Sequence, residues 1–243
     1  MTGVRGQLER KGRDVVDARL RGVRPHLAAI VLVGPALAAA ATALSGRLAL
    51  LAVPALLVAA SAWYFRTSAL RPRRWPAAAA AFGALAGAHA GAGAVLFWPA
   101  FPVAAAAFAV AAHRLAAGAR RRVLEPYTPE LADSRVEVPW QARGDRGLQL
   151  LVGHDRITLA GSRGPFRLVR PMVALSGVGA VEQILVARRA TLEVPGVGEL
   201  RVTVTPGPAV RITVPPGQWI VPTDHGREIA RLVARRKELA GVD

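Results

Sequence analysis

Histidines, serines and carboxylates are the residues of this chain whose side chains could support catalysis or bind a metal ion. His89 and His113 lie in long apolar stretches, where an ionisable group often marks a functional site. If these stretches are helical, His89 lies about 21 Å from the start of its segment at Trp75, whereas His113 lies near the level of that start. The two histidines therefore do not share a metal ion, and no cysteine or nearby carboxylate could complete such a site. We expect a neutral His89 imidazole, hydrogen-bonded to a helix neighbour, and a His113 at the end of its helix.

Two dipeptides place a base beside a carboxylate, the pairing that general-base catalysis uses: His154-Asp155 and Asp224-His225. Adjacent residues of a strand point to opposite faces, so neither dipeptide supplies a base and its orienting group by itself. We interpret them as a hairpin tip and a helix cap. Ser162 and Ser176 lie outside any Gly-x-Ser-x-Gly motif, and the sequence has neither a phosphate-binding glycine loop nor a His-Glu-x-x-His pattern. The sequence therefore predicts no catalytic residue, no metal and no cofactor, and we expect a protein that is not an enzyme.

Charge and apolar residues are segregated along the 243 residues of the chain. The net charge is +16 and 52% of the residues are hydrophobic, a combination that is rare in a single soluble domain. Residues 27–65 contain only one charged residue, Arg47, and residues 75–113 contain none, whereas residues 123–243 carry 16 basic and 13 acidic residues. This pattern excludes a soluble single-domain enzyme and a nucleic-acid-binding protein inferred from net charge alone. The absence of cysteine excludes a disulfide-stabilised secreted domain.

The apolar blocks are long enough for four transmembrane helices in two hairpins. About 20 residues cross the hydrocarbon core of a bilayer, and each block holds two such lengths. Tight turns at 45–47 and 97–99 divide the blocks, and Gly34-Pro35 predicts a kink in the first helix. A cleaved signal peptide is a poorer interpretation, because the basic stretch before the first block is too long and further apolar blocks follow. We predict four spans in residues 27–117, at about 27–45, 48–65, 75–96 and 99–117.

Basic residues flank the predicted spans on one side only. They precede the first span, separate the two hairpins and follow the fourth span: Arg5, Arg10, Lys11, Arg13, Arg19, Arg21, Arg24, Arg66, Arg71, Arg73, Arg74, Arg114, Arg120, Arg121 and Arg122. The two hairpin turns hold only Arg47. By the positive-inside rule, both termini are expected in the cytoplasm of a multi-pass cell-membrane protein.

Residues 1–26 form a basic segment in which 7–24 has the pattern of an amphipathic helix. Such a helix could lie on anionic lipid, or its charges could serve only to keep the N-terminus inside. Contacts to anionic headgroups are expected from three groups of basic residues at the cytoplasmic ends: Arg10, Lys11 and Arg13; Arg71, Arg73 and Arg74; Arg120, Arg121 and Arg122.

Three glycines spaced four residues apart, Gly83, Gly87 and Gly91, lie on one face of the third predicted span. Small residues at this spacing let a second helix approach closely in lipid. Chance spacing competes with this interpretation, because the segment is rich in glycine and alanine. Packing within one chain is the preferred hypothesis, and packing between the subunits of a homo-oligomer is the second.

After a linker at 118–130, the pattern changes to short β-strands separated by Pro-Gly turns. Strands are predicted at 135–138, 148–152, 156–160, 166–169, 181–187, 191–194, 200–205, 210–214 and 218–221. A helix over 224–239 follows, with Thr223 or Asp224 as its cap and Ile229, Leu232, Val233 and Arg236 along one face. Together these elements predict a small antiparallel β barrel or sandwich with a C-terminal helix.

Two motifs of this region, 206–212 (Pro-Gly-Pro-Ala-Val-Arg-Ile) and 218–222 (Gln-Trp-Ile-Val-Pro), precede the predicted helix. With the strand count, they resemble the bacterial pleckstrin-homology-like (PH-like) domain, which actinobacterial membrane proteins carry after transmembrane helices. The resemblance implies a cytoplasmic PH-like domain at 131–243. The sequence departs from phosphoinositide-binding relatives because the basic residues of its early hairpin region, Arg143, Arg146 and Arg156, alternate with acidic ones. Binding to a lipid headgroup and binding to a protein therefore both remain open.

Three functions from different classes fit the sequence. The first is an integral membrane protein whose cytoplasmic PH-like module acts as a non-catalytic scaffold or a binding and sensing module. The second is a small oligomeric channel or transporter, against which the absence of carboxylates in the predicted spans counts. The third is an enzyme with an unrecognised site. The first predicts the bilayer, with its anionic headgroups, and an unidentified cytoplasmic protein as partners, and no nucleic acid.

Overall fold

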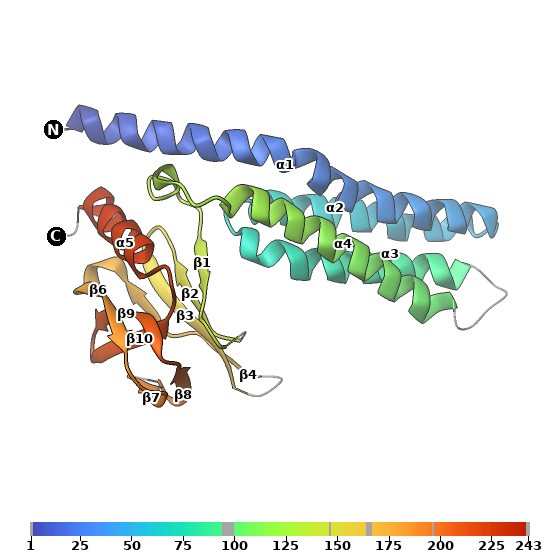
Figure 1. The fold of residues 1–243 in the computed structure, drawn as a ribbon. Helices are drawn as coiled ribbons and strands as arrows, with labels where there is room; N and C mark the ends of the chain where they lie inside the picture. Colours follow the sequence, from blue (N-terminus) through green and yellow to red (C-terminus); the bar gives the residue numbers. More distant parts are fainter. Residues whose placement is uncertain (1, 94–99, 146, 164–166, 196, 242–243) are drawn as a thin grey trace. The chain divides into compact units, whose positions relative to one another are not determined.

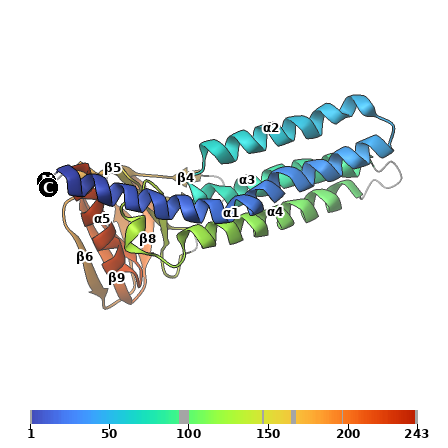
Figure 2. The same cartoon turned by 90° about the horizontal axis from the view of Figure 1, so that it is seen from above.

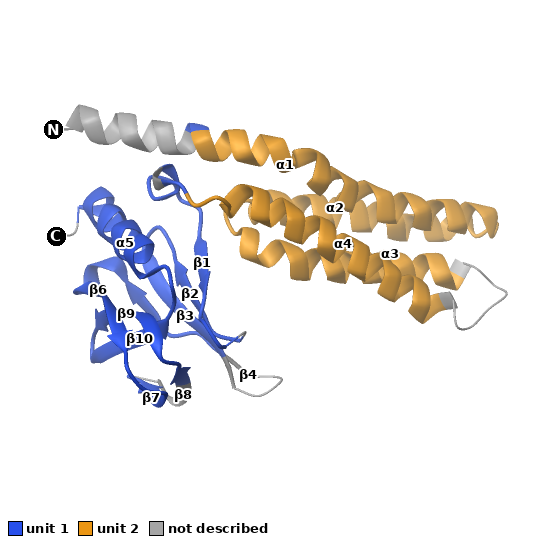
Figure 3. Ribbon diagram, viewed as in Figure 1, with its two compact units in different colours: residues 1–14, 128–243 blue, residues 15–127 orange. Residues whose placement is uncertain are grey.

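The structure is a computed structural model that describes residues 2–93, 100–145, 147–163, 167–195 and 197–241. The chain divides into two compact units (Figure 3). One comprises residues 15–127 and is helical; the other comprises residues 1–14 and 128–243 and contains the sheets. We call them the helical unit and the β unit.

Four long helices are described in the N-terminal part of the chain (Figure 1). They are α1 (Thr2–Leu44), α2 (Ala52–Thr67), α3 (Trp75–Gly93) and α4 (Ala100–Leu124), with short 3₁₀ turns η1 (Leu48–Leu51) and η2 (Pro72–Arg74) before α2 and α3. Three segments of the described residues are long and apolar enough to cross a membrane: Asp14–Leu44, Leu48–Thr67 and Phe101–Leu124. The alanine- and glycine-rich α3 does not belong to this set, so three of the four predicted spans are supported by length and hydropathy.

Helix boundaries differ from the prediction at two places. The amphipathic helix expected at 7–24 and the span expected at 27–45 form one continuous helix, α1, which includes Pro25 and Pro35. Helices of a bundle tolerate such prolines because neighbouring groups compensate for the lost hydrogen bond. α4 continues to Leu124 instead of ending at 117, because Ala119 and Val123 extend its buried face. The turn expected at 97–99 lies outside the described residues.

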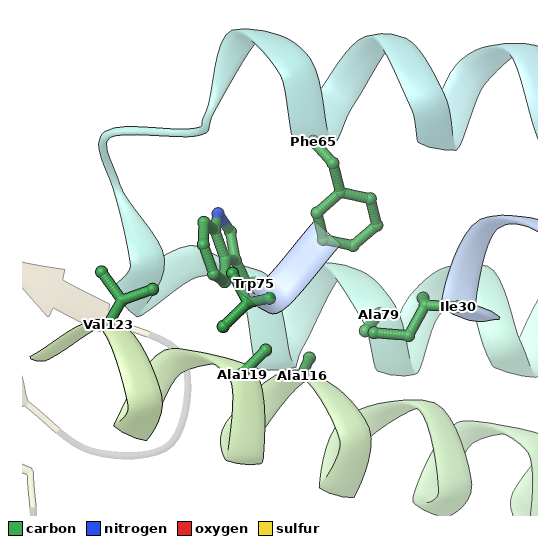
Figure 4. Packing of buried hydrophobic residues seen from close by; sticks show 8 residues of the cluster. Ile30, Phe65, Trp75, Ala79, Ala116, Ala119 and Val123 are labelled. Atoms are coloured by element: carbon green, nitrogen blue, oxygen red, sulfur yellow. The ribbon is translucent and has the colours of Figure 1, made fainter. Parts of the chain in front are cut away.

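Buried apolar side chains from all four helices meet at the end of the helical unit where α3 begins and α4 ends (Figure 4). Trp75 is completely buried among Phe65, Ala119 and Val123, and its indole N–H donates to the Ser68 carbonyl at 3.0 Å. Val23 and Ile30 contribute from α1. This cluster holds the α2–α3 connection against α1 and α4.

All the described strands of the β unit pair antiparallel. Its first sheet has the order β1-β2-β3-β4, with β5 pairing the first half of β3; its second has the order β10-β9-β6; β7 and β8 form a two-stranded ladder. The strands are β1 (Val138–Gln141), β2 (Gln149–Val152), β3 (Arg156–Arg163), β4 (Arg167–Val169), β5 (Met172–Ala174), β6 (Val181–Val186), β7 (Ala190–Val194), β8 (Val197–Val204), β9 (Gly207–Val214) and β10 (Gly217–Pro222). Short 3₁₀ turns η3 (Pro129–Leu131) and η4 (Leu175–Gly177) precede β1 and β6.

Each predicted strand overlaps an observed one, although β3, β8 and β9 extend three residues beyond the prediction at one end. Two further differences have a structural reason. The first strand begins at Val138 rather than spanning 135–138, because the preceding residues turn around Ser134, whose hydroxyl bonds the Leu131 carbonyl and the Val136 N–H. The prediction missed β5, which has three residues and pairs only with β3. The alternation expected in β9 is present, since Val210, Ile212 and Val214 are buried.

The C-terminal helix α5 (Gly226–Ala240) buries Ile229, Leu232 and Val233, as their spacing predicts. It begins two residues later than expected, with His225 at the N-cap position. Neither expected cap forms there: Thr223 accepts the N–H of His225 through its hydroxyl, and Asp224 binds Arg143 instead.

Candidate functional site

Arginines gather at the end of the helical unit where α2, α3 and α4 have their basic turns. Arg71, Arg73 and Arg74 lie in or next to η2, which contacts the last turns of α4, where Arg120, Arg121 and Arg122 lie. Arg71, Arg74, Arg121 and Arg122 are exposed, and Arg73 and Arg120 are half-buried. The structure thus brings together two of the three predicted basic groups. The side chains of the third group, Arg10, Lys11 and Arg13, lie outside what it describes.

Two hydrogen bonds connect α1 to the basic end of α4. Arg19 donates to the carbonyls of Val123 at 2.9 Å and of Pro126 at 3.1 Å. Arg122 donates to Nε2 of His26 at 2.7 Å. Arg19 is therefore in part structural, because it satisfies carbonyls at and just after the C-terminus of α4.

Two of the three predicted glycines, Gly83 and Gly87, face α4. A Cβ on Gly83 would lie 2.5 Å from the carbonyl oxygen of Phe108, and one on Gly87 would lie 2.7 Å from the carbonyl carbon of Ala104. Both obstacles are main-chain atoms, which cannot move without displacing α4. Gly91 is buried as well. On the neighbouring helix, a Cβ on Gly34 would lie 3.3 Å from the Cβ of Ala86, so α1 also approaches α3 closely.

His89 has the hydrogen bond that we expected, and its partner lies on another helix. Its Nε2 is 3.0 Å from the hydroxyl of Thr42 in α1. That hydroxyl donates to the Ala38 carbonyl at 2.8 Å, so His89 must be the donor to Thr42. His113 lies far from this pair along α4, with Nδ1 3.3 Å from the Pro76 carbonyl. Among the described residues, no three potential metal ligands come together.

The β unit buries a charged side chain that the sequence analysis left on the apolar face without a role. The guanidinium of Arg236 is only 1% exposed and donates to the carbonyls of Val152, Leu131, Ser134 and Val136, at 2.5 to 3.4 Å. These carbonyls belong to β2 and to the segment before β1. The signal was present in the sequence, since Arg236 continues the buried spacing of Ile229, Leu232 and Val233.

Arg143 binds the Pro206-Gly207-Pro208 turn at the start of β9. Its guanidinium donates to the carbonyls of Pro206 and Pro208 at 3.0 and 3.1 Å and forms an ion pair with Asp224 at 2.5 Å. Gly207 has φ of +120°, and a Cβ there would lie 2.6 Å from the Arg143 guanidinium. The positive φ therefore favours glycine, and an added Cβ would also force the Arg143 guanidinium to shift from these contacts.

Carboxylates of the two candidate dipeptides bind arginine rather than the adjacent histidine. Asp155 accepts hydrogen bonds from Arg156 at 2.6 to 3.1 Å, and this contact lowers the pKa of the Asp155 carboxyl. The stabilisation exists above the unfolded pKa of about 3.9 and is lost as the pH falls through the lowered value. In the second dipeptide Asp224 binds Arg143, and the His225 ring packs 5.1 Å from that of Trp140. Neither dipeptide forms a base with its orienting carboxylate.

Other ionic contacts of the β unit are structural. Arg235 donates hydrogen bonds to the carboxylates of Asp133 and Glu238. These bonds raise the pKa of its guanidinium, and the bond to Asp133 has the larger effect. Ser176 lies in η4, and the side chain of Ser162 is outside what the structure describes.

No protein family model, curated protein or solved structure matches this chain. The function must therefore be inferred from the geometry and chemistry of the two units.

Proposed function

We propose that the chain is an integral protein of the cell membrane with four spans and cytoplasmic termini. Its helical unit anchors a PH-like β unit, which acts as a scaffold or as a binding and sensing module without catalytic activity. The lipid bilayer is one partner, and a cytoplasmic protein is the other.

The distribution of exposed apolar side chains carries this proposal. Among the described residues, every large hydrophobic side chain that is exposed lies in the helical unit, except Met172 and Leu185. Soluble proteins rarely expose large contiguous apolar surfaces, whereas lipid-facing helices are covered with them. The β unit, in contrast, has its own buried core and a near balance of charges. One unit thus has a surface suited to lipid, and the other has a surface suited to water.

The pairing of α3 with α4 supports α3 as a membrane span, which completes the set of four. Trp75 packs with Val123, Gly83 lies against Phe108, and Gly87 lies against Ala104, so the two helices run antiparallel along their lengths. A helix that packs along a membrane-spanning neighbour must lie at the same depth. α3 also carries no charged residue, and its histidine, His89, binds Thr42 on α1.

The orientation follows from where the charges lie. The exposed arginines beside η2 and at the end of α4 share one end of the helical unit, whereas the turn between α1 and α2 has Arg47 alone. Cytoplasmic ends of spans carry such an excess of basic residues. Four spans then return the chain to the cytoplasm, where the exposed arginines face anionic headgroups.

Architecture supports the PH-like assignment of the β unit: antiparallel sheets are followed by one C-terminal helix that buries an apolar face. For binding, the most conspicuous feature is Leu185, which is 79% exposed on β6. β6 is an edge strand of the β10-β9-β6 sheet, and edge strands with exposed apolar side chains favour association.

Site-specific photo-crosslinking tests the binding role. The full chain carries a benzophenone amino acid at Leu185, or at Met172 as the matched exposed position, and is irradiated in intact membranes. We expect a discrete adduct with one cytoplasmic protein from position 185. Adducts with lipid only, or no protein adduct at either position, would refute the binding module.

A further inference from the structure

A cavity of about 280 Å³ lies within the helical unit, between α2 and the other three helices. Its walls include Ile30 and Leu37 of α1, Leu57 of α2, Phe82 of α3 and Leu115 of α4. Figure 2 shows α2 standing apart from α1, α3 and α4 over much of its length. α3 and α4 are the closest pair of helices, so the space opens on the α2 side.

The lining gives water almost nothing to bind. Ser61 supplies the one hydroxyl in the wall, and this hydroxyl already donates to the Leu57 carbonyl at 2.7 Å. A buried water needs two to four polar partners, and apolar cavities of about 150 Å³ stay dry and bind hydrocarbons instead. This cavity is larger than that, so an apolar occupant is favoured over water.

The mouth of the cavity faces the region where lipid would be. Val33, Leu37 and Leu115 line the cavity and are also 55%, 52% and 42% exposed. In a bilayer these rim residues would contact lipid tails, so a chain of methylene groups could enter from the side. Each buried methylene contributes about 0.8 kcal/mol relative to water, but less relative to lipid, so shape and headgroup contacts must supply the selectivity.

Charge at the basic end of the unit supplies that headgroup contact. Arg66 follows Ser61 by five residues on α2, a rise of about 7.5 Å. These five residues also turn the helix by about 140°, so Arg66 points away from the face that Ser61 shares with the cavity. On the other side of the α2–α3 connection, the exposed Arg74 precedes Phe82 of the cavity wall by eight residues, a rise of about 12 Å, and Arg71 lies in the same connection on the side proposed as cytoplasmic. A phosphate held there would place the first part of an acyl chain at the depth of the cavity.

We propose that the helical unit binds one anionic phospholipid, with an acyl chain in this cavity and its phosphate among the arginines of the α2–α3 connection. This inference rests on the proposed membrane insertion. It assigns a specific lipid site rather than a general attraction of basic residues to the membrane surface.

Native mass spectrometry of the full chain tests the site. Ala111→Phe narrows the cavity from its exposed rim, and Ala107→Leu does so at a second position. Ala106→Phe is the matched control, because Ala106 is exposed on the same helix but does not line the cavity. Each protein is delipidated in detergent and offered dioleoylphosphatidylglycerol or dioleoylphosphatidylcholine.

We expect one phosphatidylglycerol per chain on the wild type and on Ala106→Phe, and weak binding of phosphatidylcholine. Both cavity variants should lose the bound phosphatidylglycerol, because the added side chains occupy the space that the acyl chain would fill. If the cavity variants bound as much phosphatidylglycerol as the wild type, or if the wild type bound the two lipids equally, the proposed site would be overturned. Failure of membrane insertion is a separate result, because it would release the wild type from membranes in alkaline carbonate.

Discussion

Arg236 binds four main-chain carbonyls from a fully buried position, and this single side chain connects α5 to β2 and to the entry of the β unit. Arginine suits this role because its planar guanidinium presents five donors in fixed directions. Sequence reasoning predicted the apolar neighbours of Arg236 but not its burial, since a charge on a helix face is usually solvated. By contrast, the positions of Gly83 and Gly87 could be predicted, because spacing alone determines which residues share a helix face.

Replacing Arg236 by methionine keeps the length of the side chain and removes its donors. The carbonyls of Val152 and Val136 then lose their shortest contacts, and we expect a loss of about 3 kcal/mol in stability of the β unit. Arg235→Met is the control, because Arg235 is partly exposed and its ion pair with Asp133 should contribute about 1 kcal/mol. Hydrogen exchange of peptides from β2 and β9 in the full chain measures the loss of stability in each variant. Equal protection in the two variants would contradict the structural role.

Gly207→Ala should destabilise the turn that Arg143 holds. The new methyl group would collide with the guanidinium, and the positive φ adds strain of its own. A double-mutant cycle with Arg143→Ala separates these causes, since only the collision disappears when Arg143 is removed. We expect a coupling of about 1 kcal/mol between the two positions. Strict additivity would mean that Arg143 does not constrain the turn.

At the scale of elements, periodicity and turn residues were sufficient to predict most strands and α5. β5 escaped because three residues carry too little periodicity, and its pairing with β3 depends on residues distant in the sequence. Charge and hydropathy predicted separate segments at 7–24 and 27–45, whereas the structure continues one helix through Pro25. Contacts with the other helices stabilise the continuous helix, and such contacts cannot be predicted from one segment of the sequence.

Gly87→Ala should weaken the pairing of α3 with α4. Its methyl group would press on the main chain at Ala104, so the helices must separate, at a cost of about 2 kcal/mol. Gly118→Ala is the control on α4, because nothing lies within 4 Å of its added Cβ, and helix propensity predicts a gain of up to about 1 kcal/mol. The temperatures at which the two variants and the wild type aggregate in detergent measure their relative stabilities. If Gly87→Ala melts with the wild type, the close approach does not determine stability.

The β unit should fold without the helices. Residues 128–243 contain their own core around residues such as Trp219, Ile212 and Leu150, and their charges are nearly balanced. A fragment of these residues is expected to be soluble, rich in β structure by circular dichroism, and cooperative in its thermal melt. A fragment that stays disordered, or dissolves only in detergent, would show that this core is insufficient.

For the whole molecule, the proposed roles of the helical unit as an anchor and of the β unit as a water-exposed module depend on the path that the chain would take through a membrane. Composition and charge predicted this path, since the apolar blocks and the flanking arginines are visible in the sequence. The structure adds the antiparallel pairing of α3 with α4. If α3 crosses the membrane, Leu70 before it and Leu185 after α4 lie on the same side, whereas three spans would put them on opposite sides.

Cysteine accessibility in intact cells tests this arrangement directly, because the chain has no native cysteine. Three single variants place a cysteine at exposed positions: Arg47→Cys in the first turn, Leu70→Cys before α3 and Leu185→Cys in the β unit. A membrane-impermeant maleimide should label only Arg47→Cys before lysis and all three after it. Labelling of Leu185→Cys in intact cells, with Leu70→Cys protected, would mean that α3 does not cross the membrane and that the β unit is not cytoplasmic.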